Sequence, residues 1–144
     1  MMAELQSYML EDQRRQYTIV IGTDSHQHVK TDFVTAIVIH RVGAGGRYFW
    51  VREQVKNVHS LRERIYSEAL RSLEAARTMA EAVYVMFKEE EGYQFNMEIH
   101  VDIGERGETR EMIKEVVGMI RGSGYEVKTK PMAYGAFVVA DRHT

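Results

Sequence analysis

Four carboxylates stand beside or within apolar stretches of the sequence, where charged side chains are uncommon. Asp24 directly follows Ile-Val-Ile-Gly-Thr, Asp102 interrupts Ile-His-Val-Asp-Ile, and Asp141 directly follows Ala-Phe-Val-Val-Ala. The fourth is Glu68, within a long segment of helical periodicity. Because most carboxylates of a soluble protein are solvated, these four are the candidates for chemistry.

Glu68 is singled out by its angle on the expected helix. At 100° per residue counted from Leu61, the apolar face is centred near Ile65, at about 40°, and Glu68 falls at about −20°. Glu63 and Glu74 fall on the opposite side, at about 200° and 220°. Among these acids, Glu68 therefore borders the buried face.

Carboxylates brought together repel one another and raise each other's pKa unless cations compensate the charge. A cluster of oxygen ligands suits Mg²⁺ or Mn²⁺. Two such ions about 4 Å apart activate a water and stabilise the leaving oxygen of a phosphodiester. Taken singly, each acid has a plainer interpretation, because a strand-end aspartate often caps a turn and a helix-edge glutamate often forms a salt bridge.

Histidines near two of the acids indicate a second kind of site. Asp24, His26 and His28 alternate, so an extended chain directs them to one side, and His100 stands two residues before Asp102. Histidine ligands favour Mn²⁺, Zn²⁺ or Fe²⁺ over Mg²⁺. The plainer interpretation places His26 and His28 in the turn before the second strand and makes His100 a hydrogen-bond donor to a ligand. His26 and His100 could also orient a ligand or shuttle a proton.

Further polar residues could contact a substrate. Ser25 could bind a phosphate or a metal-bound water, or serve as an ordinary turn hydroxyl, and His143 stands two residues after Asp141. Lys128 and Lys130 share one side of an expected strand and could receive a phosphate backbone, aided by Arg106. Their plainer interpretation is a solubilising surface role.

The elements that position these residues follow from the hydropathy pattern. Three β-rich segments with short connections predict an antiparallel meander, and alternating strands and helices then predict parallel crossovers. Ser60 and Glu63 form a capping box at the start of the long helix. The expected strands are 17–24, 32–41, 47–55, 96–103 and 125–130, the helices are 61–87, 108–121 and 132–142, and 3–16 is a frayed leading helix.

Apolar spacing predicts which residues are buried. The aromatic stretch Tyr48-Phe-Trp50 is assigned to the core or to a subunit contact, and a homodimer is among the expected assemblies. The long helix is expected to bury one stripe, formed by Leu61, Ile65, Ala69, Ser72, Ala76, Ala80, Val83 and Phe87.

Composition narrows the class of protein. The chain of 144 residues is 44% hydrophobic and 28% charged with a formal charge of −2, which excludes binding of nucleic acid by bulk positive charge. It has no cysteine, which excludes disulfide scaffolds and thiolate metal sites. Apolar runs are too short for a membrane span and no secretory signal is evident, so we expect a cytoplasmic protein. We expect a leading segment, 1–16, and one domain, 17–144.

These features resemble a known fold. A three-strand meander with Asp24, then Glu68 on a helix, Asp102 on the fourth strand and Asp141 on a closing helix looks like the ribonuclease H-like fold. The motifs Gly-Thr-Asp-Ser, His-Val-Asp-Ile-Gly, Lys-Pro and Ala-Asp-Arg are similar to those of the YkuK-like family of ribonuclease H-like proteins. The resemblance implies metal-dependent phosphodiester hydrolysis with the four acids as ligands.

The sequence therefore predicts an α/β protein with a five-stranded mixed sheet flanked by helices. Its expected function is hydrolysis of a phosphodiester in a short or single-stranded nucleic acid or a nucleotide, with two Mg²⁺ or Mn²⁺ ions as cofactors. Two alternatives remain open. One is a Mn, Fe or Zn phosphoesterase acting on a small molecule through Asp24, His26, His100 and Asp102, and the other is a binding or assembly module without turnover.

Overall fold

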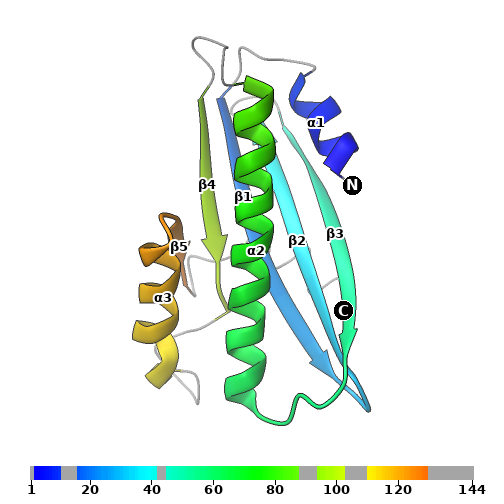
Figure 1. Ribbon diagram of the computed structural model, residues 1–144, viewed down its shortest axis with the longest axis vertical. Helices are drawn as coiled ribbons and strands as arrows, with labels where there is room; N and C mark the ends of the chain where they lie inside the picture. The colour runs from blue at the N-terminus through cyan, green and yellow to red at the C-terminus, as the bar shows by residue number, and fades with distance from the viewer. Residues whose placement is uncertain (1, 11–15, 42–44, 88–93, 103–109, 130–144) are drawn as a thin grey trace.

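The computed structural model describes residues 2–10, 16–41, 45–87, 94–102 and 110–129. Its elements in chain order are α1 (Met2–Leu10), β1 (Gln16–Gln27), β2 (Thr31–Arg41), β3 (Gly46–Val55), α2 (Leu61–Phe87), β4 (Gln94–His100), the 3₁₀ turn η1 (Arg110–Met112), α3 (Ile113–Gly122) and β5 (Glu126–Lys128). The strands form one sheet in the order β3-β2-β1-β4-β5 (Figure 1).

The sheet is mixed, as the sequence predicts. β1 pairs antiparallel with β2, and β2 antiparallel with β3, which makes the meander. β4 lies parallel to β1, and β5 parallel to β4. A helix lies in the connection between the strands of each parallel pair, because two parallel strands need a long crossover to bring the chain back to the same edge.

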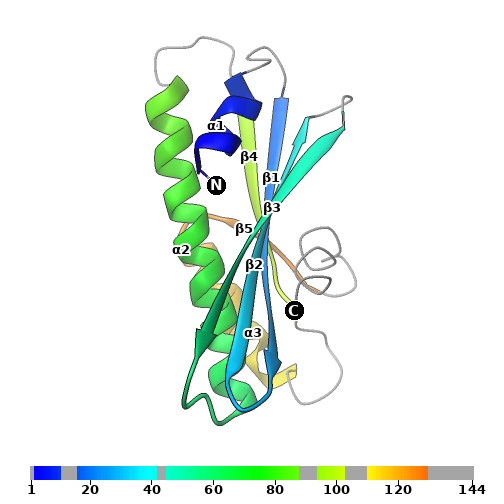
Figure 2. The ribbon, with the colours of Figure 1, turned by 90° about the vertical axis from the view of Figure 1, so that its right-hand side faces the viewer.

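The helices α1, α2 and α3 lie on the same face of the sheet (Figure 2). Alternation along β1 directs Tyr17, Ile19 and Ile21 into the core beneath them. A smaller buried cluster, centred on Val34 and Ala36 of β2, lies on the opposite face. The sheet therefore carries two differently built faces, and side chains one residue apart on a strand enter different surroundings.

The long helix α2 starts where the sequence predicts. The Ser60 hydroxyl accepts a hydrogen bond from the backbone N–H of Glu63 at 3.1 Å, and the Glu63 carboxylate accepts one from the N–H of His59 at 3.2 Å. The return bond reaches one residue further back than a regular capping box requires. Side chains thus accept hydrogen bonds from the backbone N–H groups of Glu63, in the first turn, and of His59, just before the helix.

The buried stripe of α2 follows the prediction over most of its length. Leu61, the first residue of the helix, is exposed, contrary to prediction. Met79, which was not predicted, is buried. The residues of α2 that are fully buried are Ile65, Ala69, Ser72, Ala76, Met79 and Val83.

Several predicted boundaries were wrong by a few residues. β1 continues to Gln27, so His26 lies on the strand and not in a turn, because β2 pairs with it along this length. β4 ends at His100, so Asp102 follows the strand. β5 has only three residues, where six were predicted. The predicted closing helix, 132–142, lies outside the described residues.

The leading helix is better anchored than predicted. It spans Met2–Leu10 in the described residues, and Gln16, predicted to end it, is the first residue of β1. Tyr8 and Met9 are buried in the core, and the Tyr17 hydroxyl donates a hydrogen bond to the Met9 carbonyl at 3.2 Å. The Arg41 guanidinium lies 4.0 Å from the centroid of the Tyr8 ring and donates to the Tyr8 carbonyl. These contacts hold α1 on the sheet.

Within the described part of the chain, no helix combines the length and hydropathy that a bilayer crossing requires.

Replacing Met79 by alanine tests the packing of α2 on the sheet. Met79 is 1% exposed, so its truncation leaves a cavity and should lower the free energy of unfolding by about 2–5 kcal/mol. Leu70 on the same helix is 54% exposed, and Leu70→Ala should change it by less than about 0.5 kcal/mol. Urea denaturation followed by circular dichroism measures both, and equal losses would contradict the burial of this face.

Candidate acidic site between helix α2 and strand β1

One row of α2 side chains lies along β1. Arg64, Glu68 and Ser72 are spaced four residues apart, so they project from one side of the helix. The Ser25 hydroxyl donates a hydrogen bond to the Glu68 carboxyl at 2.5 Å. Ser72 and Thr23 hydroxyl oxygens are 2.8 Å apart. The row therefore joins the helix to the carboxyl-terminal half of β1 by polar contacts.

Arg64 fixes the strand side of this contact. Its Nε donates to the Ser25 hydroxyl at 3.1 Å, and a terminal guanidinium nitrogen donates to the Ser25 carbonyl at 3.0 Å. Ser25 itself is buried. Because Ser25 accepts from Arg64 and donates to Glu68, the arginine orients the hydroxyl that holds the glutamate.

The Glu68 carboxyl has a strongly altered acidity. Its pKa is raised from 4.5 to about 8. Burial is the largest cause, and the negative charges of Asp24 and Asp102 add to it, while the Ser25 hydrogen bond and the Arg64 charge partly oppose these effects. Glu68 is therefore largely protonated at neutral pH. A partly buried acid with two acidic neighbours is an arrangement whose negative charge a bound cation would compensate.

The register of the sheet brings Asp24 and Asp102 together. Gly22 of β1 pairs with His100 of β4, and each aspartate lies two residues beyond that pair. The backbone N–H of Val101 donates to the Lys128 carbonyl at 2.9 Å, so the chain stays beside β5 after β4 ends. Both aspartates thus come within electrostatic reach of Glu68. Asp141 lies outside the described residues.

Strand β4 carries a second polar group that was not predicted. Glu98 is buried, and its carboxylate lies 2.9 Å from the Lys128 ammonium and 3.3 Å from Nε2 of His100. Burial alone would raise the pKa of Glu98, but the bonds from Lys128 and His100 outweigh it and lower the pKa. The same bond to Glu98 raises the pKa of Lys128. Lys128 therefore has an internal partner as well as a substrate-facing candidate role.

His100 is held in a defined orientation. His100 is 8% exposed, and burial lowers the pKa of its imidazole, although the hydrogen bond and charge of Glu98 partly oppose that effect. A neutral imidazole that donates its Nε2 hydrogen to Glu98 keeps a lone pair on Nδ1. Among the described residues, that buried Nδ1 has no hydrogen-bond partner.

The remaining predicted residues are placed as follows. His26 is exposed, and its ring centroid lies 4.4 Å from that of His28. Lys130, His143 and Arg106 lie outside the described residues.

The donor set fits a hard divalent cation by its chemistry. Asp24, Glu68 and Asp102 offer carboxylate oxygens, which Mg²⁺ and Mn²⁺ prefer. Over the described ranges, however, no three His, Asp or Glu side chains are gathered closely enough to hold a metal ion. The same finding applies to the alternative set that includes His26 and His100. The Glu68 carboxyl instead accepts a hydrogen bond from the Ser25 hydroxyl.

Two residues of the site were missed by sequence reasoning. Arg64 stands one helical turn before Glu68, so both side chains lie on the same side of the predicted helix. Glu98 shares the alternation that placed His100 and Asp102 on one face of β4. The pattern was present in both cases, but surface arginines and strand glutamates are so common that type alone did not distinguish them.

Replacing Glu68 by glutamine should change how stability depends on pH. The folded-state pKa of about 8 lies above the ordinary 4.5, so the folded protein holds this proton more tightly than the unfolded chain. Unfolding therefore becomes easier as pH rises from about 5 to 8, by up to about 1.4 kcal/mol per pH unit. Glu68→Gln removes this contribution, whereas exposed Glu74→Gln keeps it.

Chemical denaturation at pH 5, 6, 7 and 8 measures the effect as the difference between each variant and the parent protein. A Glu68→Gln difference that stays constant with pH would contradict the raised pKa of this glutamate.

Replacing Glu98 by glutamine should lower the pKa of His100. The Glu98 charge raises that pKa against the effect of burial, and glutamine keeps the shape but removes the charge. Titration of the imidazole by two-dimensional NMR measures the pKa and the tautomer in one experiment. Glu126→Gln, at an exposed position opposite Glu98 on β5, is the control and should leave the His100 pKa unchanged.

Comparisons with known proteins agree with this architecture. The ribonuclease H-like family model matches residues 1–144. The chain is 35% identical over 151 residues to "Uncharacterized protein YkuK" of Bacillus subtilis (strain 168), covering 99% of this chain and 88% of that protein.

Two solved structures of the Mos1 transposase catalytic domain are also similar. One, solved with Raltegravir and Mn, has a TM-score of 0.35 at 12% identity, covering 99% of this chain and 67% of that chain. The other has a TM-score of 0.27 at 13% identity, covering 94% and 58%. The match along the whole sequence, together with the mixed five-stranded sheet, shows that the chain belongs to the ribonuclease H-like family.

Proposed function

We propose that this protein hydrolyses a phosphodiester bond in a nucleic acid or nucleotide with the help of divalent cations. The observation that carries the proposal is Glu68, a partly buried carboxyl whose pKa is raised to about 8 by burial and by the neighbouring Asp24 and Asp102. Perturbed acids of this kind are concentrated at functional sites, because a fold that placed them for stability alone would avoid the electrostatic cost.

Asp24, Glu68 and Asp102 are the proposed ligands from the described residues, and Asp141 is the proposed fourth. Bound Mg²⁺ or Mn²⁺ would supply charge neutralisation and an activated water. Displacement of the Glu68 proton would free its carboxylate for ligation, while the Ser25 hydroxyl and Arg64 keep the side chain in place. Helix α2 and strand β1 thus orient the Glu68 side chain before a cation binds.

The substrate is expected to be gripped locally. The chain has a formal charge of −2, so bulk attraction for a polyanion is weak. Arg64 lies beside Glu68 and Lys128 beside Glu98, and both cations are already oriented by hydrogen bonds or ion pairs. A short or single-stranded segment, or a nucleotide, needs only a few such contacts.

Five further residues are proposed to position the substrate or the ligands: Ser25, His26, His100, Lys130 and His143.

A nuclease assay on labelled single-stranded RNA, single-stranded DNA, an RNA–DNA hybrid and a nucleotide tests the proposal. With Mg²⁺ or Mn²⁺ the parent protein should cleave at least one of them, and EDTA should abolish cleavage. Asp102→Asn and Asp24→Asn should each lower the rate by about 100-fold or more, because each replaces a negatively charged ligand of the cation by a neutral amide.

Glu74→Gln on the exposed side of α2 is the matched control and should keep full activity. Isothermal titration with Mn²⁺ should show weaker binding to Asp102→Asn. Cleavage that is unaffected by Asp102→Asn would identify a contaminant and reject the assignment.

A further inference from the structure

A groove lies between helix α3 and strand β5, which are neighbours at one side of the sheet (Figure 1). It has a volume of about 400 Å³. Helix α3 lines it with Lys114, Val117, Gly118 and Arg121, and the strand side lines it with Val127 and Thr129. β5 is the last strand of the described sheet on this side, so the groove lies at the rim of the molecule.

Two cations of α3 border this groove. Lys114 and Arg121 are exposed and seven residues apart, so they lie on one side of the helix about 10 Å from each other. Within the described part of the chain, neither forms an ion pair. The acid Glu115 on the same helix pairs instead with Arg62 of α2, at 3.1 Å. No acid is among the described residues that line the groove, so its lining carries a net positive charge.

Gly118 stands between the two cations. Glycine inside a helix lowers the stability of that helix relative to alanine. A Cβ built at Gly118 would meet nothing within 4 Å beyond the helix's own backbone, so internal packing does not require glycine there. The missing side chain instead leaves the helix backbone open to a molecule that lies in the groove, which is a common use of glycine beside a ligand.

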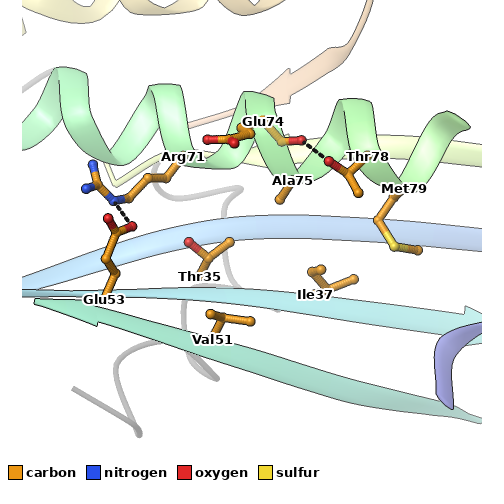
Figure 3. Close-up of a pocket in the computed structure, with 9 residues that line it drawn as sticks. All are labelled: Thr35, Ile37, Val51, Glu53, Arg71, Glu74, Ala75, Thr78 and Met79. Carbon is orange, nitrogen blue, oxygen red and sulfur yellow. Dashed lines mark hydrogen bonds and ion pairs between the residues drawn. The ribbon is translucent and has the colours of Figure 1, made fainter. Parts of the chain in front are cut away.

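The hollow between α2 and the strand pair β2–β3 has a different character (Figure 3). Its volume is about 200 Å³, and the cation that lines it, Arg71, is paired with Glu53 at 3.1 Å. Glu74 lines it as well, so its lining has no surplus of positive charge. Of these two hollows, the groove beside β5 is therefore the one suited to an anion.

The groove is continuous with the acidic site. Val116 of α3 lines the small cavity that Asp102 also lines, and the next residue, Val117, lines the groove. On the strand side, the N–H of the residue before Asp102 donates to the carbonyl of the residue before Thr129, at 2.9 Å. A long ligand in the groove therefore leads towards the acids.

We propose that this groove binds the backbone of a single-stranded nucleic acid and directs the strand to the acidic site. Lys114 and Arg121 pair with phosphates, and their separation of about 10 Å matches about three phosphates of one strand, at about 3.4 Å each. The apolar lining, which includes Val117 and Val127, suits sugars and base faces, which a single strand exposes and a duplex covers. This inference rests on the proposed hydrolysis, but binding is measured without turnover.

Fluorescence anisotropy of a fluorescein-labelled single-stranded oligonucleotide of about ten nucleotides, in EDTA, tests the groove. Lys114→Gln and Arg121→Gln should each weaken binding about tenfold, and each should reduce the slope of log K against log salt by about 0.7, because each loses one phosphate contact. Lys56→Gln is the matched control, since Lys56 is an exposed cation that follows β3 on the opposite side of the sheet. It should keep the affinity and the slope of the parent protein.

Gly118→Gln tests the groove without changing the charge. The variant should be at least as resistant to urea as the parent protein, because glutamine favours a helix more than glycine does and the position is open. Its long side chain should nevertheless fill the groove and weaken oligonucleotide binding about tenfold. Gly118→Ala adds only a methyl group and should weaken binding less. Parental affinity in Gly118→Gln would overturn the proposal.

The same titrations separate this inference from the proposed hydrolysis. Asp102→Asn should still bind the oligonucleotide in EDTA at least as tightly as the parent protein, because it only removes a negative charge. A parent protein that binds through the groove but cleaves nothing with Mg²⁺ or Mn²⁺ would overturn the hydrolysis alone. Parental affinity in both Lys114→Gln and Arg121→Gln, or equal affinity of the parent protein for a polyglutamate peptide of the same charge, would overturn the groove assignment.

Discussion

The contact between α2 and the end of β1 is the constraint on which the candidate site depends. Packing holds the backbone of Glu68 at this interface, because Ile65 and Ala69 of the same helix are buried in the core. Packing thus places the Glu68 side chain beside the end of β1. The Ser25 hydroxyl, itself bonded by Arg64, determines where the Glu68 carboxyl lies. Hydrophobic burial supplies the force, and the polar row supplies the orientation.

That arrangement is unfavourable for the folded protein on its own. The burial of Glu68 and the charges of Asp24 and Asp102 act in the same direction, and both make ionisation of the acid costly. Elsewhere the chain solves the same problem differently, since buried Glu98 is compensated by Lys128 and His100. The contrast between an acid whose pKa stays raised and one whose pKa is lowered, both near the sheet end, is the clearest physical reason to assign chemistry to the first.

The two sides of the sheet also differ in construction. Beyond β1, the parallel strands β4 and β5 bring the chain back past the acids. On the other side, the meander ends in β3, where Tyr48 and Trp50 are 46% and 41% exposed, so their assignment to the core is wrong. Strand β2 separates β3 from β1, which carries Asp24.

Local chemistry determined much of what could be predicted from the sequence. Alternation and helical spacing gave the order of the elements, the mixed sheet and the buried side of α2, because these depend on neighbours within a few residues. The same spacing identified Glu68 as the acid bordering the core. The end of β1, the exposure of Leu61 and the brevity of β5 depended on how far each element is covered by others, and no local pattern encodes that. Only the folded chain brought Glu68 to Asp24 and Asp102 and Glu98 to Lys128, because pKa values and ion pairs are set by distances between residues far apart in sequence.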